Sequence, residues 1–158
     1  KVVEEKCKEN GIICEWKADD GLRLINKNDA IKIHPITGEK AWFNHTQVFH
    51  LSAAAIEYHK IHQRQKRWET FKYSMLLELM TWYKKLTKDP NEQSMHVTFG
   101  DDSAIPDEYV QHIQDVIWKN MIIQPWRKGD IICIDNFSTS HGRLPYYGPR
   151  EIMVCWTS

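Results

Sequence analysis

Several features that mark other classes of protein are missing from this sequence. The chain has only four cysteines, Cys7, Cys14, Cys133 and Cys155, and no two of them form a C-x-x-C pair. A thiol redox motif or a zinc ribbon is therefore not indicated, and we expect reduced, packed thiols. No apolar run approaches the roughly 18 to 20 residues that span a bilayer, and no apolar segment follows the basic start. The sequence predicts an intracellular, cytoplasmic protein without a membrane partner.

An excess of one charge is missing as well. Basic and acidic residues number 21 each and are interspersed, which removes the electrostatic footprint of a nucleic-acid-binding protein. No glycine-rich phosphate loop, G-x-S-x-G elbow, internal repeat or low-complexity segment is present. We therefore expect no nucleic acid as a partner.

The length of 158 residues suits one domain or a piece of one. The chain begins with Lys1 instead of Met and stops at Ser158 directly after an apolar run. We expect residues 1–158 to be the C-terminal portion of a single, longer domain.

The first 50 residues alternate between short apolar segments and turn signals. A short helix is expected up to Asn10, and Asp19-Asp20-Gly21 predicts a turn between two strands. A second turn is expected at 34–39. The predicted strands cover 12–16, 22–25, 30–33 and 40–44.

The middle of the chain is helical in pattern. Residues 52–88 contain no Gly or Pro, and their apolar positions recur at helical spacing. The aromatic and methionine-rich stripe from Trp68 to Tyr83 favours packing in a core or a lid. Pro106 opens a second helix, which ends near Asn120.

The last third returns to strand-like patterns. Strands are predicted at 97–99, 121–124, 131–135 and 150–157, with a tight connection at 125–130. Short strands with turns between them and a few helices favour an α+β chain with a barrel-like or sandwich β core.

One segment combines residues that could carry chemistry. A predicted strand leads into a polar turn containing His141, and Arg150 opens the next strand. An imidazole at a rigid strand end can bind Fe(II), and a neighbouring guanidinium can hold a carboxylate with two parallel hydrogen bonds. From spacing alone, a turn histidine and a surface arginine explain the pattern better than a metal site does.

Two ordered motifs carry a resemblance to a known family. The segment W-x-x-G-D-I-I-x-x-D-N-x-x-x-x-H-G-R-x-P-x-x-G-P-R-x-I-x-V, Trp126 to Val154, resembles the C-terminal signature of the TauD/TfdA dioxygenases, particularly their clavaminate synthase-like and SyrP-like branch. The segment H-P-x-T-G-E-x-x-W-F-N, His34 to Asn44, is similar to a stretch of the same branch. The resemblance leaves out the region from Glu57 to His96, where we expect a helical insertion or lid.

The resemblance implies a partial double-stranded β-helix, the jelly roll, with flanking helices. It implies an oxidoreductase that uses Fe(II), 2-oxoglutarate and O2 to oxidise a small amino-acid-like or carboxylate substrate by hydroxylation. In such an enzyme His141 would be a metal ligand and Arg150 would bind 2-oxoglutarate. Arg143 is the reserve candidate, because the step from His141 to Arg150 is short for the family. Asn44 and Asn136 would line the substrate pocket.

One departure from the family pattern bears directly on the metal site. The family supplies its other two metal ligands from H-x-D or H-x-E, and none of the eight histidines here has Asp or Glu two positions later. We expect that half of the site upstream of Lys1. The alternative is a non-catalytic dioxygenase-like fragment that acts as a binding or interaction module. A weaker alternative is that the basic residues between Lys60 and Lys72 bind an acidic partner or a membrane surface.

Overall fold

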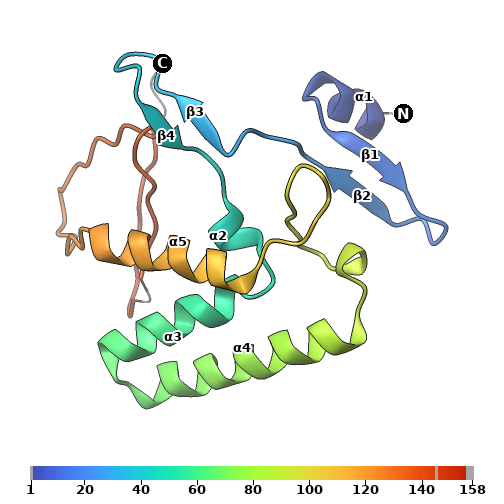
Figure 1. Cartoon of the computed structure of the whole chain (residues 1–158). Coiled ribbons are helices and arrows are strands. Elements are labelled where there is room, and N and C mark those ends of the chain that lie inside the picture. The colour runs from blue at the N-terminus through green and yellow to red at the C-terminus, as the bar shows by residue number, and fades with distance from the viewer. Residues whose placement is uncertain (1, 145, 156–158) are drawn as a thin grey trace.

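The structure is a computed structural model that describes residues 2–144 and 146–155. Helices and short strands occupy its first 120 residues, and a long irregular segment follows (Figure 1). The elements, in chain order, are α1 (Val2–Glu9), β1 (Ile13–Trp16), β2 (Leu22–Ile25), β3 (Ile31–Ile33), β4 (Lys40–Trp42), α2 (Thr46–Phe49), α3 (Ala53–Gln65), α4 (Trp68–Thr87), the 3-10 helix η1 (Pro90–Glu92) and α5 (Asp107–Asn120).

The first hairpin confirms the prediction from its turn chemistry. β1 and β2 pair antiparallel from Ile13↔Ile25 to Trp16↔Leu22. The side chain of Asp19 accepts the backbone N–H of Gly21 at 3.1 Å, and this local bond closes the turn. Strand pairing here depends on residues close in sequence, which is why the sequence could predict it.

The second hairpin, β3–β4, is also confirmed and positions the residues that matter below. Its antiparallel register runs from Ile31↔Trp42 to Ile33↔Lys40. His34 follows β3 directly, and its backbone N–H donates to the carbonyl of Glu39 at 2.8 Å. Gly38 has φ +72°, the left-handed region that glycine enters without a steric penalty, and so completes the turn.

The predicted helical stretch 52–88 forms two antiparallel helices, α3 and α4, packed side by side (Figure 1). Lys66 ends α3 in a left-handed conformation, φ 50°, and its N–H caps the carbonyl of His62 at 2.7 Å. A left-handed residue at this position commonly terminates a helix. The chain therefore reverses direction at Lys66 and Arg67.

α4 has its large apolar side chains on the outside. The buried Thr70 and Ser74 lie against α3, whereas Trp68, Leu79 and Trp82 are 65%, 61% and 61% exposed. Of the two predictions for the stripe from Trp68 to Tyr83, packing in a core is therefore wrong for the described residues, whereas a lid stays a prediction. Close approach of α3 favours small side chains at the contact, so the bulky ones occupy the opposite face.

α5 confirms the second predicted helix and covers α2 and α3. Val110 is completely buried, and the amide of Gln114 donates to the carbonyls of Ala53 at 3.1 Å and Gln47 at 3.2 Å. The indole N–H of Trp118 donates to Glu57 of α3 at 2.9 Å. The small apolar core of the described residues consists of Cys7, Ala53, Ile61 and Val110.

The strands predicted in the last third are wrong for the described residues. Residues 121–124, 131–135 and 150–155 form no strand, and residues 156 and 157 of the last prediction lie outside the described part. The strand predicted at 97–99 is reduced to one bridge, Thr98↔Ala104. A strand forms only by pairing with another strand, and the two described sheets contain only β1–β2 and β3–β4. Ile122 and Ile131 stay exposed.

The fold class is confirmed in its coarse form. The described chain is α+β, but its strands make two separate two-stranded sheets and no complete double-stranded β-helix. Of the four cysteines, Cys7 is buried as expected, whereas Cys133 and Cys155 are exposed. None of the described helices has the length and apolar character that a membrane crossing requires.

Candidate functional site

The two sequence motifs meet at His34 and Asp135. His34 is 6% exposed at the end of β3, and its Nε2 lies 2.8 Å from Oδ2 of Asp135. Its Nδ1 accepts the backbone N–H groups of Ile36 and Thr37, both at 3.1 Å. Because Nδ1 already accepts two hydrogen bonds, the ring proton belongs on Nε2, which donates to Asp135.

Asp135 organises the turn that leads to His141. Its Oδ1 accepts the backbone N–H of Phe137 at 3.0 Å, and its Oδ2 accepts the hydroxyl of Ser138 at 2.8 Å. These bonds, with the one from His34, lower the pKa of Asp135 from 3.8 to about 2, because all of them favour the ionised carboxylate. The backbone carbonyl of Asp135 accepts the N–H of Thr139 at 3.0 Å.

Aromatic packing fixes the same turn against the hairpin. The ring of Phe137 lies edge-on to His34 at 5.4 Å between centroids and tilted against Phe43 at 4.8 Å. The ammonium group of Lys32 lies 4.5 Å from the centroid of the Phe43 ring. Residues 135–139 are thus attached to β3–β4 by a hydrogen bond and a ring cluster together.

The predicted site residues beyond this turn lie on an exposed, irregular segment. His141, Arg143 and Arg150 are all exposed. The guanidinium groups of Arg143 and Arg150 lie 5.3 and 5.1 Å from the centroid of the Tyr146 ring. The structure therefore brings the two candidate carboxylate-binding arginines to one aromatic side chain.

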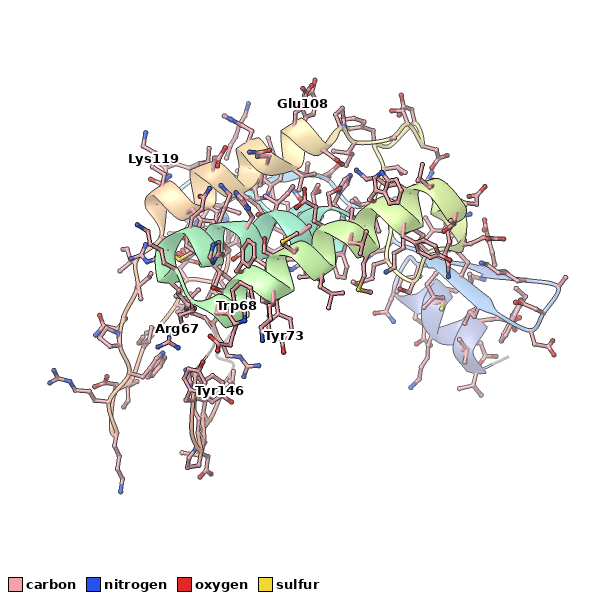
Figure 2. All side chains as sticks on the ribbon, turned by 90° about the horizontal axis from the view of Figure 1, so that it is seen from below. Arg67, Trp68, Tyr73, Glu108, Lys119 and Tyr146 are labelled. Carbon is pink, nitrogen blue, oxygen red and sulfur yellow. The ribbon has the colours of Figure 1, made fainter. Side chains whose placement is uncertain are left out.

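A further contact joins this segment to the helices. Arg67, at the start of α4, donates to the hydroxyl of Tyr147 at 3.1 Å, and its guanidinium lies 5.4 Å from that ring. Figure 2 shows Arg67 and Trp68 at the turn between α3 and α4, and Tyr146 on the irregular segment. The C-terminal motif consequently contacts both the hairpin and the helical pair.

The two predicted pocket residues are placed differently. Asn44 donates to the carbonyl of Ala30 and accepts the backbone N–H of Thr46, both at 3.0 Å, so it stabilises the start of α2. Asn136 is exposed within the Asp135 turn. Their role as substrate-pocket residues stays a prediction.

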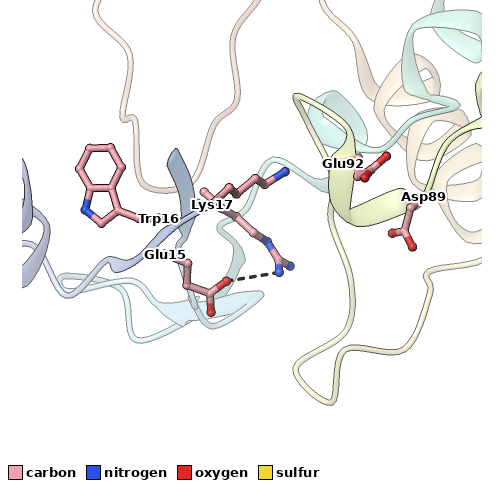
Figure 3. Close-up of a pocket in the computed structure, with 6 residues that line it drawn as sticks. Glu15, Trp16, Lys17, Asp89 and Glu92 are labelled. Atoms are coloured by element: carbon pink, nitrogen blue, oxygen red, sulfur yellow. Dashed lines mark hydrogen bonds and ion pairs between the residues drawn. The ribbon is translucent and has the colours of Figure 1, made fainter. Parts of the chain in front are cut away.

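Two hollows in the surface of the described residues lie elsewhere. One, of about 380 Å³, is shown in Figure 3 and is lined by Glu15, Trp16, Lys17, Arg23, Asp89 and Glu92. Arg23 and Glu15 form an ion pair at 3.4 Å there. A second hollow of similar volume is lined by Ile122, Gln124, Asp130, Ile131 and Ile132. Neither of these two contains a predicted site residue.

The described residues do not form an iron site by themselves. Among residues 2–144 and 146–155, no three His, Cys, Asp or Glu side chains are grouped as a metal ion requires. His141 supplies one suitable imidazole, whereas a 2-His-1-carboxylate site needs three ligands.

A second polar cluster lies where three helices meet. Asp107, at the start of α5, accepts the hydroxyl of Ser52 at 2.8 Å and is paired with Lys85 of α4. Burial works to raise the pKa of Asp107, but the hydrogen bonds from Lys85 and Ser52 outweigh it and hold that pKa below 3.8. His50 donates from Nε2 to the carbonyl of Ile105 at 3.0 Å and accepts the N–H of Ser52, which is a structural role.

Sequence reasoning missed the His34–Asp135 pair. A histidine placed directly before Pro35 at the end of a strand, and an aspartate ending an apolar run, were the available signals. Neither signal reveals that the two side chains meet, because 101 positions separate them.

Comparison with known proteins identifies the family of this chain. The family described as "Taurine catabolism dioxygenase TauD, TfdA family" matches residues 8–156, and the chain belongs to this family. The match spans both motifs that meet at His34 and Asp135.

Two relatives illustrate the likeness. The chain is 30% identical over 152 residues to the dapdiamide synthesis protein DdaC of Enterobacter agglomerans, covering 96% of this chain and 40% of that protein. It is 25% identical over 154 residues to the clavaminate synthase-like protein At3g21360 of Arabidopsis thaliana, covering 97% of this chain and 37% of that protein. The chain thus spans about two fifths of the length of these relatives. No solved structure was found to match it.

Proposed function

We propose that this chain supplies part of the active site of an Fe(II)- and 2-oxoglutarate-dependent dioxygenase that hydroxylates a small amino-acid-like or carboxylate substrate with O2. The observation that carries the proposal is the family match over residues 8–156, which includes both motifs. Family membership supports an oxidoreductase of the dioxygenase type. Iron, 2-oxoglutarate and the substrate class belong to the proposal.

The proposal assigns His141 as a metal ligand. An exposed imidazole on a segment attached to a hairpin has a donor nitrogen of the kind that Fe(II) binds. Since the described residues offer no complete ligand set, the proposal requires two further ligands, of the H-x-D or H-x-E type, from polypeptide that this sequence does not contain. No chemical step is assigned to the chain acting alone.

The proposal assigns Arg150 to the carboxylate of 2-oxoglutarate, with Arg143 in reserve. A guanidinium can hold a carboxylate with two parallel, charge-assisted hydrogen bonds. Contact of both arginines with Tyr146 supports this role, because a shared ring limits the positions that the two guanidinium groups adopt.

The test begins with the coding sequence in frame upstream of Lys1, where the proposal expects an H-x-D or H-x-E motif. The longest in-frame polypeptide is then assayed for Fe(II)-dependent conversion of 2-oxoglutarate to succinate. His141→Ala should abolish succinate formation, whereas His112→Ala, an exposed histidine of α5, should leave it unchanged. Full activity of the His141 variant would overturn the assignment.

A non-catalytic binding module is the second candidate, and the absence of H-x-D and H-x-E from this sequence favours it. A start codon directly before the codon of Lys1, together with no succinate formation by the purified chain, would establish this candidate over the first. Iron-dependent succinate formation by the 158-residue chain itself would exclude it.

A further inference from the structure

We infer that His34 is a positioning residue, which acts through Asp135 to fix the turn from which the His141 segment leaves the β3–β4 hairpin. His34 is not among the candidate ligands or carboxylate-binding groups. Both ring nitrogens of His34 nevertheless have hydrogen-bond partners, and the residue is only 6% exposed.

The tautomer of His34 determines that His34 is the donor in its hydrogen bond with Asp135. The two N–H groups that point at Nδ1 come from Ile36 and Thr37, in the tight turn after β3. They leave Nε2 as the protonated nitrogen, so the turn determines that His34 presents a donor to Asp135. A carboxylate is the matching acceptor, and the side chain of Asp135 is 52% exposed, so burial alone does not hold it in place.

Asp135 connects His34 to the residues that precede His141. Its Oδ1 accepts the backbone N–H of Phe137, and its Oδ2 accepts both the hydroxyl of Ser138 and the Nε2–H of His34. Its carbonyl accepts the N–H of Thr139, two positions before His141. The direction in which the chain leaves towards His141 is therefore set from β3, although the described residues 121–144 and 146–155 contain no helix or strand.

Two substitutions at His34 separate the functions of its two nitrogens. His34→Asn can accept at the Nδ1 position but is too short to reach Asp135, so the 34–39 turn should persist while the Asp135 contact is lost. His34→Gln can donate near the Nε2 position and should restore that contact in part. The inference depends on the proposed function only for what His141 does there, and the measurement needs neither metal nor cosubstrate.

The experiment is NMR on the 158-residue chain with 15N-labelled histidine. Wild type should show His34 as the neutral tautomer with the proton on Nε2. In His34→Asn the amides of Phe137 and Thr139 should exchange with solvent about tenfold faster, as expected for loss of one charge-assisted hydrogen bond, and the His141 signals should shift. His34→Gln should reduce both changes, and signals of the β1–β2 hairpin should stay in place in both variants.

Asp135→Asn provides an independent variant on an exposed side chain. Its oxygen can still accept from Phe137, but its NH2 group would face the Nε2–H of His34. The same His141 signals should therefore move as in His34→Asn. Unchanged Phe137, Thr139 and His141 signals in His34→Asn, or a proton on Nδ1 in wild type, would overturn the inference whatever the activity of the enzyme.

Discussion

The hydroxyl of Ser52 donates to the carboxylate of Asp107 at 2.8 Å across 55 positions of sequence. Ser52 precedes α3 and Asp107 begins α5, while Lys85 of α4 reaches the other oxygen of the same carboxylate. One side chain therefore joins the ends of three helices. Because Ser52 is buried, its hydroxyl has no ready replacement partner in water.

Asp107→Ala is expected to destabilise the chain by about 1 to 3 kcal/mol, since it leaves the buried hydroxyl of Ser52 without its acceptor and removes the ion pair with Lys85. Urea denaturation followed by circular dichroism at 222 nm measures this loss. Glu108→Ala, at the next position on the exposed side of the same helix turn, is the control and should cost about 0.5 kcal/mol or less (Figure 2). Equal losses for the two variants would contradict the role given to Asp107.

The turn at Asp135 should tolerate acid to an unusual degree. The pKa of Asp135 is lowered to about 2 in the folded chain from 3.8, so its contribution to stability is complete above about pH 4 and is lost as pH falls towards 2. The difference in Tm between wild type and Asp135→Asn should therefore be constant from pH 7 to about 5 and shrink between pH 4 and 2. A difference that grows as the pH falls would have the wrong sign.

Two apolar substitutions should differ sharply in their effect on the free energy of unfolding. Ile61→Ala, at a buried position of α3, should cost about 2 to 4 kcal/mol, because the side chain is 5% exposed and its removal leaves a cavity. Leu79→Ala should change stability by no more than about 0.5 kcal/mol, because Leu79 is already in contact with solvent. A large loss at Leu79, measured by the same urea denaturation, would mean that its side chain is covered.

Arg150→Lys tests the proposed carboxylate contact in the holoenzyme. Replacement of the guanidinium fork by a single ammonium should weaken 2-oxoglutarate binding about tenfold or more and raise its KM, because one of two charge-assisted hydrogen bonds is lost. Arg64→Lys, on the exposed surface of α3, should leave that KM unchanged. If Arg143→Lys raises the KM for 2-oxoglutarate and Arg150→Lys does not, Arg143 is the residue that binds the carboxylate.

The sequence predicted well wherever structure depends on neighbours along the chain. The Asp19–Gly21 turn and the turn at 34–39 defined both hairpins, and the Pro106 signal located α5. The strands predicted at 131–135 and 150–157 were wrong for the described residues, because a strand forms only against a partner, and apolar patterning does not specify that partner.

The site was predicted in part for a related reason. The two motifs identified the family, and the family match over residues 8–156 confirms it. The contact between His34 and Asp135 required the three-dimensional arrangement, because it joins two turns that local patterns describe separately. The helical periodicity of α4 was also correct, but periodicity does not determine which face meets α3.

The outward apolar face of α4 has a thermodynamic consequence. Trp68, Leu79 and Trp82 contact water in the folded chain, so unfolding adds little to their hydration. The heat-capacity change of unfolding comes mainly from newly hydrated apolar surface and is ordinarily about 12 to 15 cal/mol/K per residue. Calorimetry of this chain should give a value per residue below that range. Its stability should then vary less steeply with temperature than that of a domain of equal length with a larger core.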